Sequence, residues 1–217
     1  MLVPKRLYPL LACAGIMMAV VAAVVGQIES APYLDSLHLT LGEYAVLGGG
    51  GGAIGFALAA LAGASLATVA GLRAAAAPVG TAAERLLLVW SAALAVLAVL
   101  PALAPGLDAE AAAQAYRYTS IVAFAAVPAA GGLMAAGFRR DERWRPVAAP
   151  VEWLALAGGF GLLALVYVAL PGHGVLIGLV ERVTLVIGTA LIGVPAVRVA
   201  RLTWARGATR ASQAALG

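Results

Sequence analysis

The segment "LGGGGGAIGFALAALAGASLATVAGLR", residues 47–73, decides the class of protein, because it opens with five consecutive glycines and then stays apolar. A phosphate-binding loop would follow a strand and end in Lys-Ser or Lys-Thr, and no lysine follows here. A flexible linker would be flanked by polar residues on both sides. The run instead continues for about twenty apolar residues, the length that a helix needs to cross ~30 Å of hydrocarbon. We therefore predict a transmembrane helix rich in small residues.

The composition of the whole chain supports a membrane protein. Of its 217 residues, 63% are hydrophobic and 11% are charged, and the mean hydropathy is +0.99. Soluble domains are about half apolar and about a quarter charged. The net charge of +4 does not form a basic stripe on a soluble domain, so we expect no nucleic-acid partner.

Five further apolar segments, each bounded by charged residues, predict an all-α bundle of six transmembrane helices. We expect one domain over residues 1–204, followed by a loose cytoplasmic tail over residues 205–217. The predicted helices cover residues 7–27, 44–72, 86–104, 117–138, 151–170 and 178–202.

The distribution of positive charge predicts the orientation. If the N-terminus is cytoplasmic, 12 of the 14 Lys and Arg residues lie on the cytoplasmic side, and only Arg117 and Arg182 lie outside. We therefore expect a multi-pass protein of the bacterial inner membrane with both termini in the cytoplasm. All four tryptophans fall near the predicted inner face, as in an aromatic belt: Trp90, Trp144, Trp153 and Trp204.

Small residues spaced four apart predict close helix packing, since they let neighbouring backbones approach. Gly51 and Gly55 form such a pair at the start of the second predicted helix. These faces could also hold a partner membrane protein or a second copy of the chain. The other glycines that we expect at close contacts are Gly48, Gly52, Gly63, Gly131, Gly132, Gly158, Gly159, Gly161, Gly188 and Gly193.

The last predicted helix is short for a bilayer. Only 15 residues separate Arg182 from Arg198, which corresponds to ~22 Å of helix. Glu181 and Arg182 are thus expected at or just inside the outer hydrocarbon boundary, where charge is costly and needs partners. Adjacent helical residues point about 100° apart, so these two cannot satisfy each other.

We name the expected group of residues the charged shelf. It pairs Glu181 with Arg117 and Arg182 with Glu43 or Asp108, and places Tyr116 and the glycine run around Gly51 beside them. The shelf is either a buried clamp that fixes three helices or a site for a lipid headgroup or small solute.

Known catalytic chemistry is not evident in the sequence. No nucleophile–base motif or HExxH occurs, and the two histidines, His38 and His173, lie in predicted links, so we expect no cofactor. A metal site of these histidines with Asp35 is conceivable, but it lacks ligand spacing. We predict a non-enzymatic protein that binds lipid or another amphiphile at the charged shelf and serves as an accessory subunit of a membrane assembly. The alternative is a transporter or channel that is gated at the same shelf.

The second half resembles the integral membrane family catalogued as domain of unknown function 998. The resemblance rests on "YRYTSIVAFAAVPAAGGLMAAGFRRDERWR", residues 116–145 and on "GLVERVTLVIGTALIG", residues 178–193. It covers roughly residues 115–202 and implies about six helices and no assigned activity. Many members carry a histidine near the start of the fourth helix, where this chain has Tyr116 and Arg117.

Overall fold

The computed structural model describes residues 7–30, 51–103, 109–170 and 176–214, and every regular element within them is an α-helix. All six helices are long and apolar enough to cross a membrane, which confirms the predicted all-α, six-helix architecture. They are α1 (Tyr8–Ser30), α3 (Gly51–Ala74), α4 (Thr81–Leu103), α5 (Ala109–Phe138), α6 (Arg145–Ala169) and α7 (Ile177–Ala214).

Several helices are longer than the apolar segments from which they were predicted. α5 begins at Ala109 rather than residue 117, α6 begins at Arg145 rather than residue 151, and α7 continues through Ala214 rather than ending at residue 202. Apolar runs mark only the part of a helix that suits hydrocarbon, whereas backbone hydrogen bonds continue into polar turns. Residues 44–50 of the second predicted helix lie outside the described residues.

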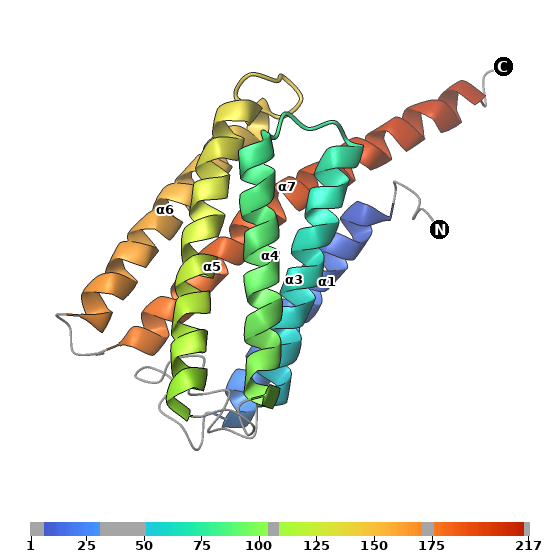
Figure 1. Ribbon diagram of the computed structural model, residues 1–217. Coiled ribbons are helices and arrows are strands. Elements are labelled where there is room, and N and C mark those ends of the chain that lie inside the picture. Colours follow the sequence, from blue (N-terminus) through green and yellow to red (C-terminus); the bar gives the residue numbers. More distant parts are fainter. Residues whose placement is uncertain (1–6, 31–50, 104–108, 171–175, 215–217) are drawn as a thin grey trace.

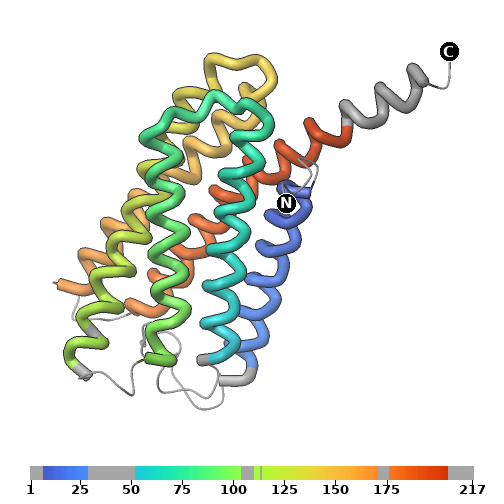
Figure 2. The backbone as a smooth tube through the Cα atoms, turned by 45° about the vertical axis from the view of Figure 1, so that its right-hand side comes forward, coloured from blue at the N-terminus to red at the C-terminus, as the bar shows by residue number. Residues whose placement is uncertain are grey.

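The helices form a closed ring of neighbours. Consecutive helices pack against each other from α1 to α7, and α1 also contacts α7. Figure 1 shows α7 running obliquely behind the others, and the tube in Figure 2 shows the same slant. α1 begins and α7 ends at one end of the bundle, here called the termini end; the opposite end is called the far end (Figure 1).

The core lies where α4, α5 and α7 meet. The Trp90 side chain of α4 is 0% exposed, and its indole nitrogen donates to the Ser65 hydroxyl of α3 at 3.1 Å. A Cβ placed on Gly188 of α7 would lie 3.2 Å from Trp90 Cη2 and 3.3 Å from Val127 Cγ1 of α5. α7 therefore approaches this tryptophan closely only because position 188 carries no side chain.

Two of the four tryptophans expected in an aromatic belt are buried instead. Trp153 and Trp204 are exposed, but Trp90 and Trp144 are both 0% exposed within the bundle. Trp144 stacks on Phe138 with ring centroids 5.0 Å apart. Apolar packing inside the protein thus takes these two rings out of reach of lipid headgroups.

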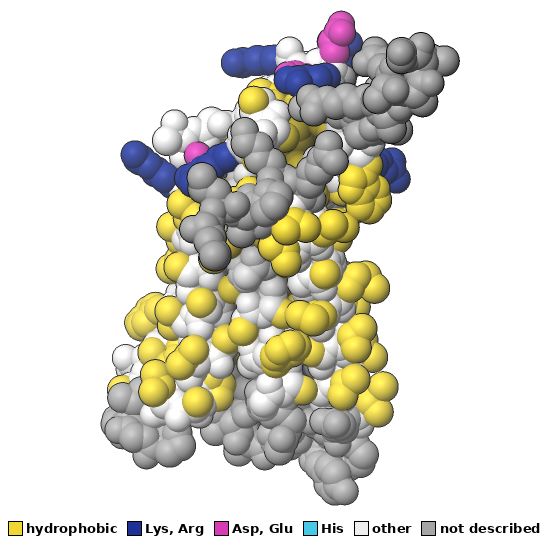
Figure 3. All heavy atoms as spheres, turned by 90° about the vertical axis from the view of Figure 1, so that its right-hand side faces the viewer, with side chains coloured by type: hydrophobic (Ala, Val, Ile, Leu, Met, Phe, Trp, Pro, Cys, Tyr) yellow, Lys and Arg dark blue, Asp and Glu magenta, His cyan; other side chains and the backbone are white. Residues whose placement is uncertain are grey.

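Charged side chains gather at the termini end, and apolar side chains cover the middle of the bundle (Figure 3). Three ion pairs lie there: Arg73 with Glu84, Arg139 with Glu152, and Arg143 with Asp141. This distribution is what a membrane-spanning bundle requires, because its apolar band faces lipid and its charges remain in water.

Candidate functional site

Glu181 is a carboxylate buried near the far end of α7. Its side chain is 6% exposed. It lies on the same helical face as Thr184 and Gly188, which are three and seven residues further along. Gly188 faces Trp90 of α4 and Val127 of α5, and Thr184 lies against Gly161 of α6, so this face of α7 is directed toward the other helices. The carboxylate therefore belongs to the interior of the bundle.

Tyr116 and Ser120 lie on the face of α5 that is directed toward α7. They are one helical turn apart, and Val127, which packs near Gly188, continues the same stripe. Ser120 precedes this contact by seven residues on α5, and Glu181 precedes it by seven residues on α7. Both helices run from the far end to the termini end (Figure 1), so Ser120 and Glu181 precede the contact by the same number of residues in the same direction.

The electrostatic interactions agree with this register. Tyr116 is half-buried, and Glu181 and Arg182 are the charged groups that act electrostatically on its hydroxyl. The Ser120 side chain is 9% exposed, and its hydroxyl has no hydrogen-bond partner within the described part of the chain.

Arg182 is half-buried and is directed toward α1. Its Nη1 donates to the Gly178 carbonyl at 2.9 Å. With the Gln27 amide oriented so that its oxygen faces the guanidinium, that oxygen accepts from Nε at 2.6 Å and from Nη2 at 3.2 Å. Arg182 thus links the ends of α1 and α7. We name the whole group the polar cluster; it consists of Gln27, Tyr116, Ser120, Glu181 and Arg182.

The polar cluster overlaps the expected charged shelf only in part. It brings together Tyr116, Glu181 and Arg182, whereas the Arg117 side chain is exposed. No ion pair between described residues joins Arg117 to Glu181. Arg117 follows Tyr116 by one residue and hence points about 100° away from the α7-facing stripe.

The structure does not describe the remaining carboxylates of the expected shelf or the two histidines of the conceivable metal site. Glu43, Asp108, His38 and His173 lie outside the described residues. Gly51 is the first residue of α3. Among the described residues no group of three or more His, Cys, Asp or Glu side chains could hold a metal ion.

Sequence reasoning missed Ser120, Gln27 and Thr184. Ser120 lies four residues after Tyr116, and Thr184 lies three residues after Glu181, so helical spacing from the predicted shelf would have found both. Gln27 is a polar residue at the end of an otherwise apolar helix, but the partner across from it depends on how α1 packs against α7.

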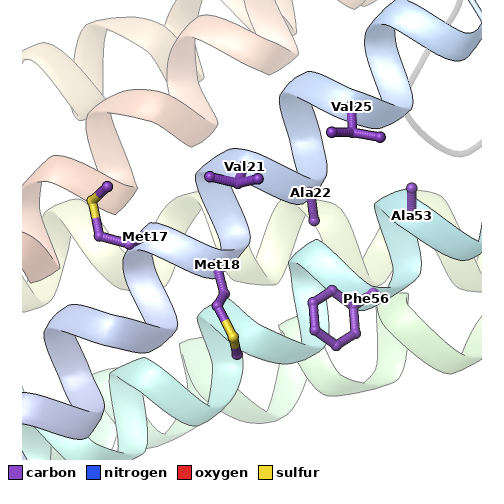
Figure 4. A pocket seen from close by; sticks show the side chains of 7 residues that line it. All are labelled: Met17, Met18, Val21, Ala22, Val25, Ala53 and Phe56. Carbon is purple, nitrogen blue, oxygen red and sulfur yellow. The ribbon is translucent and has the colours of Figure 1, made fainter.

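A separate apolar groove of about 440 Å³ lies between α1 and α3. Figure 4 shows the side chains that line it: Met17, Met18, Val21, Ala22, Val25, Ala53 and Phe56. Val25 and Gln27 are two residues apart and point about 200° apart around α1. The groove and the polar cluster therefore lie on different sides of this helix and are not one continuous site.

Among the comparisons with known proteins, only the comparison with family models found a match. No curated protein and no solved structure matches the chain. A family described as "Protein of unknown function (DUF998)" matches residues 13–198, which is most of the chain and includes every residue of the polar cluster. This multi-pass helical protein belongs to the DUF998 family.

Proposed function

We propose that this protein binds a membrane lipid or another amphiphile, and that the polar cluster contacts the polar headgroup. The observation that carries the proposal is the buried Glu181 carboxylate, which precedes Arg182 in α7 and acts with it on the Tyr116 hydroxyl at the far end of a membrane-spanning bundle. We place the far end in the outer leaflet and both termini in the cytoplasm of a bacterial inner membrane.

The free-energy cost of placing Glu181 and Arg182 within a membrane-spanning helix is the reason to assign them a role. A charged side chain within a membrane-spanning segment costs ~3 kcal/mol or more on insertion, and such residues commonly mark binding or transport sites. A purely apolar helix of the same length would pack and insert without this cost. A headgroup that interacts with the cluster would offset part of the cost.

Lipid binding is favoured over catalysis by the chemistry of the cluster. It combines an acceptor-only carboxylate, a guanidinium donor and two hydroxyls, which suits recognition of a polar group by hydrogen bonds. Small-residue helix faces would in addition allow the protein to serve as an accessory subunit of a membrane assembly.

Native mass spectrometry of protein extracted in a mild detergent tests the proposal. The wild-type protein is expected to retain lipid, and Glu181→Gln is expected to lose most of it. Glu152→Gln is the matched control, because Glu152 is paired with Arg139 at the termini end. Equal retention by all three proteins would refute the site.

The two other interpretations give different results in the same experiment. A structural clamp predicts that Glu181→Gln lowers the unfolding temperature although the wild type retains no lipid. A transporter or channel predicts solute flux in reconstituted vesicles that is lost in Glu181→Gln and kept in Glu152→Gln.

A further inference from the structure

α6 is the least buried of the six described membrane-spanning helices. In its most apolar stretch 17% of the residues are buried, the smallest share among these helices. It packs against α5 and α7, and Figure 1 shows it at one side of the bundle. The face of α6 that is directed away from α5 and α7 is therefore available to lipid or to another protein.

Large apolar side chains on this outward face follow a heptad pattern. Their spacing alternates between three and four residues from position 153 to position 170, and each side chain is between 49% and 73% exposed. Two large residues in every seven form a narrow stripe, which is typical of a coiled-coil interface. The six residues, called here the α6 seam, are Trp153, Leu156, Phe160, Leu163, Tyr167 and Leu170.

A helix face that meets only lipid does not need such a narrow stripe, and the outward face of α1 is broader. Four pairs of adjacent large side chains are exposed along α1: Leu10 with Leu11, Met17 with Met18, Val20 with Val21, and Val24 with Val25. Between residues 153 and 170 of α6 one such pair occurs, Val166 with Tyr167. Apolar area alone does not drive helices together in lipid, whereas complementary packing does. The narrow α6 seam therefore suits a facing helix better than it suits acyl chains.

Small residues flank the α6 seam and leave room for such a helix. They are Ala157, Gly159 and Ala164. A Cβ at Gly159 would meet nothing within 4 Å, whereas a Cβ at the neighbouring Gly158 would lie 3.1 Å from Pro128 Cβ of α5. Packing within the chain thus explains Gly158 but not Gly159. Because glycine destabilises a helix relative to alanine, a close neighbour from outside the chain would account for Gly159.

We infer that two copies of this chain associate through the α6 seam, with their α6 helices parallel. Copies of a membrane protein share one orientation, so a two-fold axis along the membrane normal brings the same surface of each copy together. Equivalent positions of the heptad then meet, and aromatic layers of Trp153, Phe160 and Tyr167 alternate with leucine layers. The α6 seam is thereby complementary to itself, which favours a second copy over a different partner.

The exposed area is sufficient for a stable dimer. At ~200 Å² for a large side chain, the exposed fractions of the α6 seam amount to about 800 Å², the area that each partner of a standard interface buries. The inference is independent of the proposed function, because α6 contributes no residue to the polar cluster.

Energy transfer between copies labelled with donor or acceptor dye at the C-terminus tests the inference in lipid vesicles. The full-length wild type is expected to form dimers as the protein-to-lipid ratio rises. Phe160→Ala is expected to weaken dimerisation about tenfold, since it removes the central aromatic layer. Phe56→Ala is the matched control, because Phe56 is 53% exposed on α3 and lies outside the α6 seam. A wild type that stays monomeric, or equal effects of the two variants, would overturn the inference.

A second pair of variants adds bulk instead of removing it. Gly159→Leu is expected to block the close approach of the second α6 and to leave the unfolding temperature of the monomer nearly unchanged, because the space beside it is open within the chain. Gly63→Leu is the control: a Cβ at Gly63 of α3 would also meet nothing within 4 Å. Dimerisation that survives Gly159→Leu but not Gly63→Leu would place the interface elsewhere and contradict the inference.

Disulfide crosslinking in membranes tests the interface with the aromatic layers intact. Cys13→Ala first removes the single cysteine of the chain. In that background, Leu163→Cys is expected to crosslink two copies, because equivalent heptad positions face each other across a parallel pair. Val21→Cys, at a 56% exposed position of α1, is expected not to crosslink. Equal crosslinking at both positions, or crosslinking only at position 21, would refute the α6 interface.

Discussion

Replacement of Gly137 by alanine should destabilise the protein although alanine is the better helix former. Gly137 lies at the end of α5, where a Cβ would clash with the backbone oxygen of Pro78 in the α3–α4 link. Contacts under 3.0 Å essentially never occur for a real Cβ. The obstacle is backbone, so the link has to move by about 1 Å, and overpacking of this kind costs ~1–3 kcal/mol.

Gly132 on the same helix supplies the control. A Cβ at this position would meet nothing within 4 Å. Gly132→Ala should therefore be neutral or should stabilise the protein by ~0.5–1 kcal/mol through helix propensity alone. Gly137→Ala has the same propensity gain, which leaves a net loss of ~1–2 kcal/mol after the overpacking cost.

Tryptophan fluorescence during heating in detergent measures the difference. Trp144 is 0% exposed and stacks on Phe138, the residue next to Gly137, so it reports on the perturbed region. The two variants differ by the overpacking cost of ~1–3 kcal/mol, so at about 2–4 °C per kcal/mol for a chain of this size they should unfold roughly 2–12 °C apart. Unfolding temperatures that shift equally in both variants would refute the close approach of Pro78 to α5.

Three further substitutions test contacts elsewhere in the bundle. Trp90→Phe should lower the unfolding free energy by about 1–3 kcal/mol, because it leaves the buried Ser65 hydroxyl without its donor and opens space beside α7. Chemical denaturation measures this free energy, and an unchanged midpoint would contradict the packing of Trp90 against α3 and α7. Arg198→Gln should speed proteolysis of the α5–α6 link, because the Arg198 guanidinium donates hydrogen bonds to the Arg143 carbonyl in that link. Cleavage at the wild-type rate would show that these hydrogen bonds do not protect the link. At Asp141 slight desolvation raises the carboxyl pKa, but hydrogen bonds from Arg143 outweigh it and hold the pKa below its usual value. A depressed pKa stabilises the folded state above the unfolded value, so the stability difference between the wild type and Asp141→Asn should shrink as the pH falls below 3.8, and a difference that grows in acid would contradict the sign.

The helix count and the apolar band followed from the sequence because they depend on length and hydropathy, which are properties of each segment alone. Which glycines lie at contacts did not follow. Gly131 and Gly132 are adjacent, yet a Cβ at Gly131 would lie 2.6 Å from Leu191 Cδ1, and one at Gly132 would meet nothing within 4 Å. The same contrast separates Gly158 from Gly159. Only the rotation of each helix against its neighbour decides between such pairs.

The sequence argument predicted that Glu181 needs partners, but the identity of its neighbours depends on tertiary packing. The positions of Arg117 and Glu181 along the predicted helices suggested that they lie together, because both are near the far end. Helical phase instead directs Tyr116 and Ser120 toward α7. Position along a helix can be predicted from the sequence, whereas the direction in which a side chain points into a bundle depends on which helices meet.

The ring of helices has a consequence for biosynthesis. As the chain leaves the ribosome, each new helix up to α6 can pack against its immediate predecessor, forming a row of hairpins with two open edges. α7 contacts α1, α3, α5 and α6, so it joins those edges only after every other span has been inserted. Until that moment the interior faces of α3, α4 and α5 adjoin lipid. Completion of the membrane domain is therefore a late event, and a chain that stops before α7 would present an unfinished, laterally open assembly to membrane quality control.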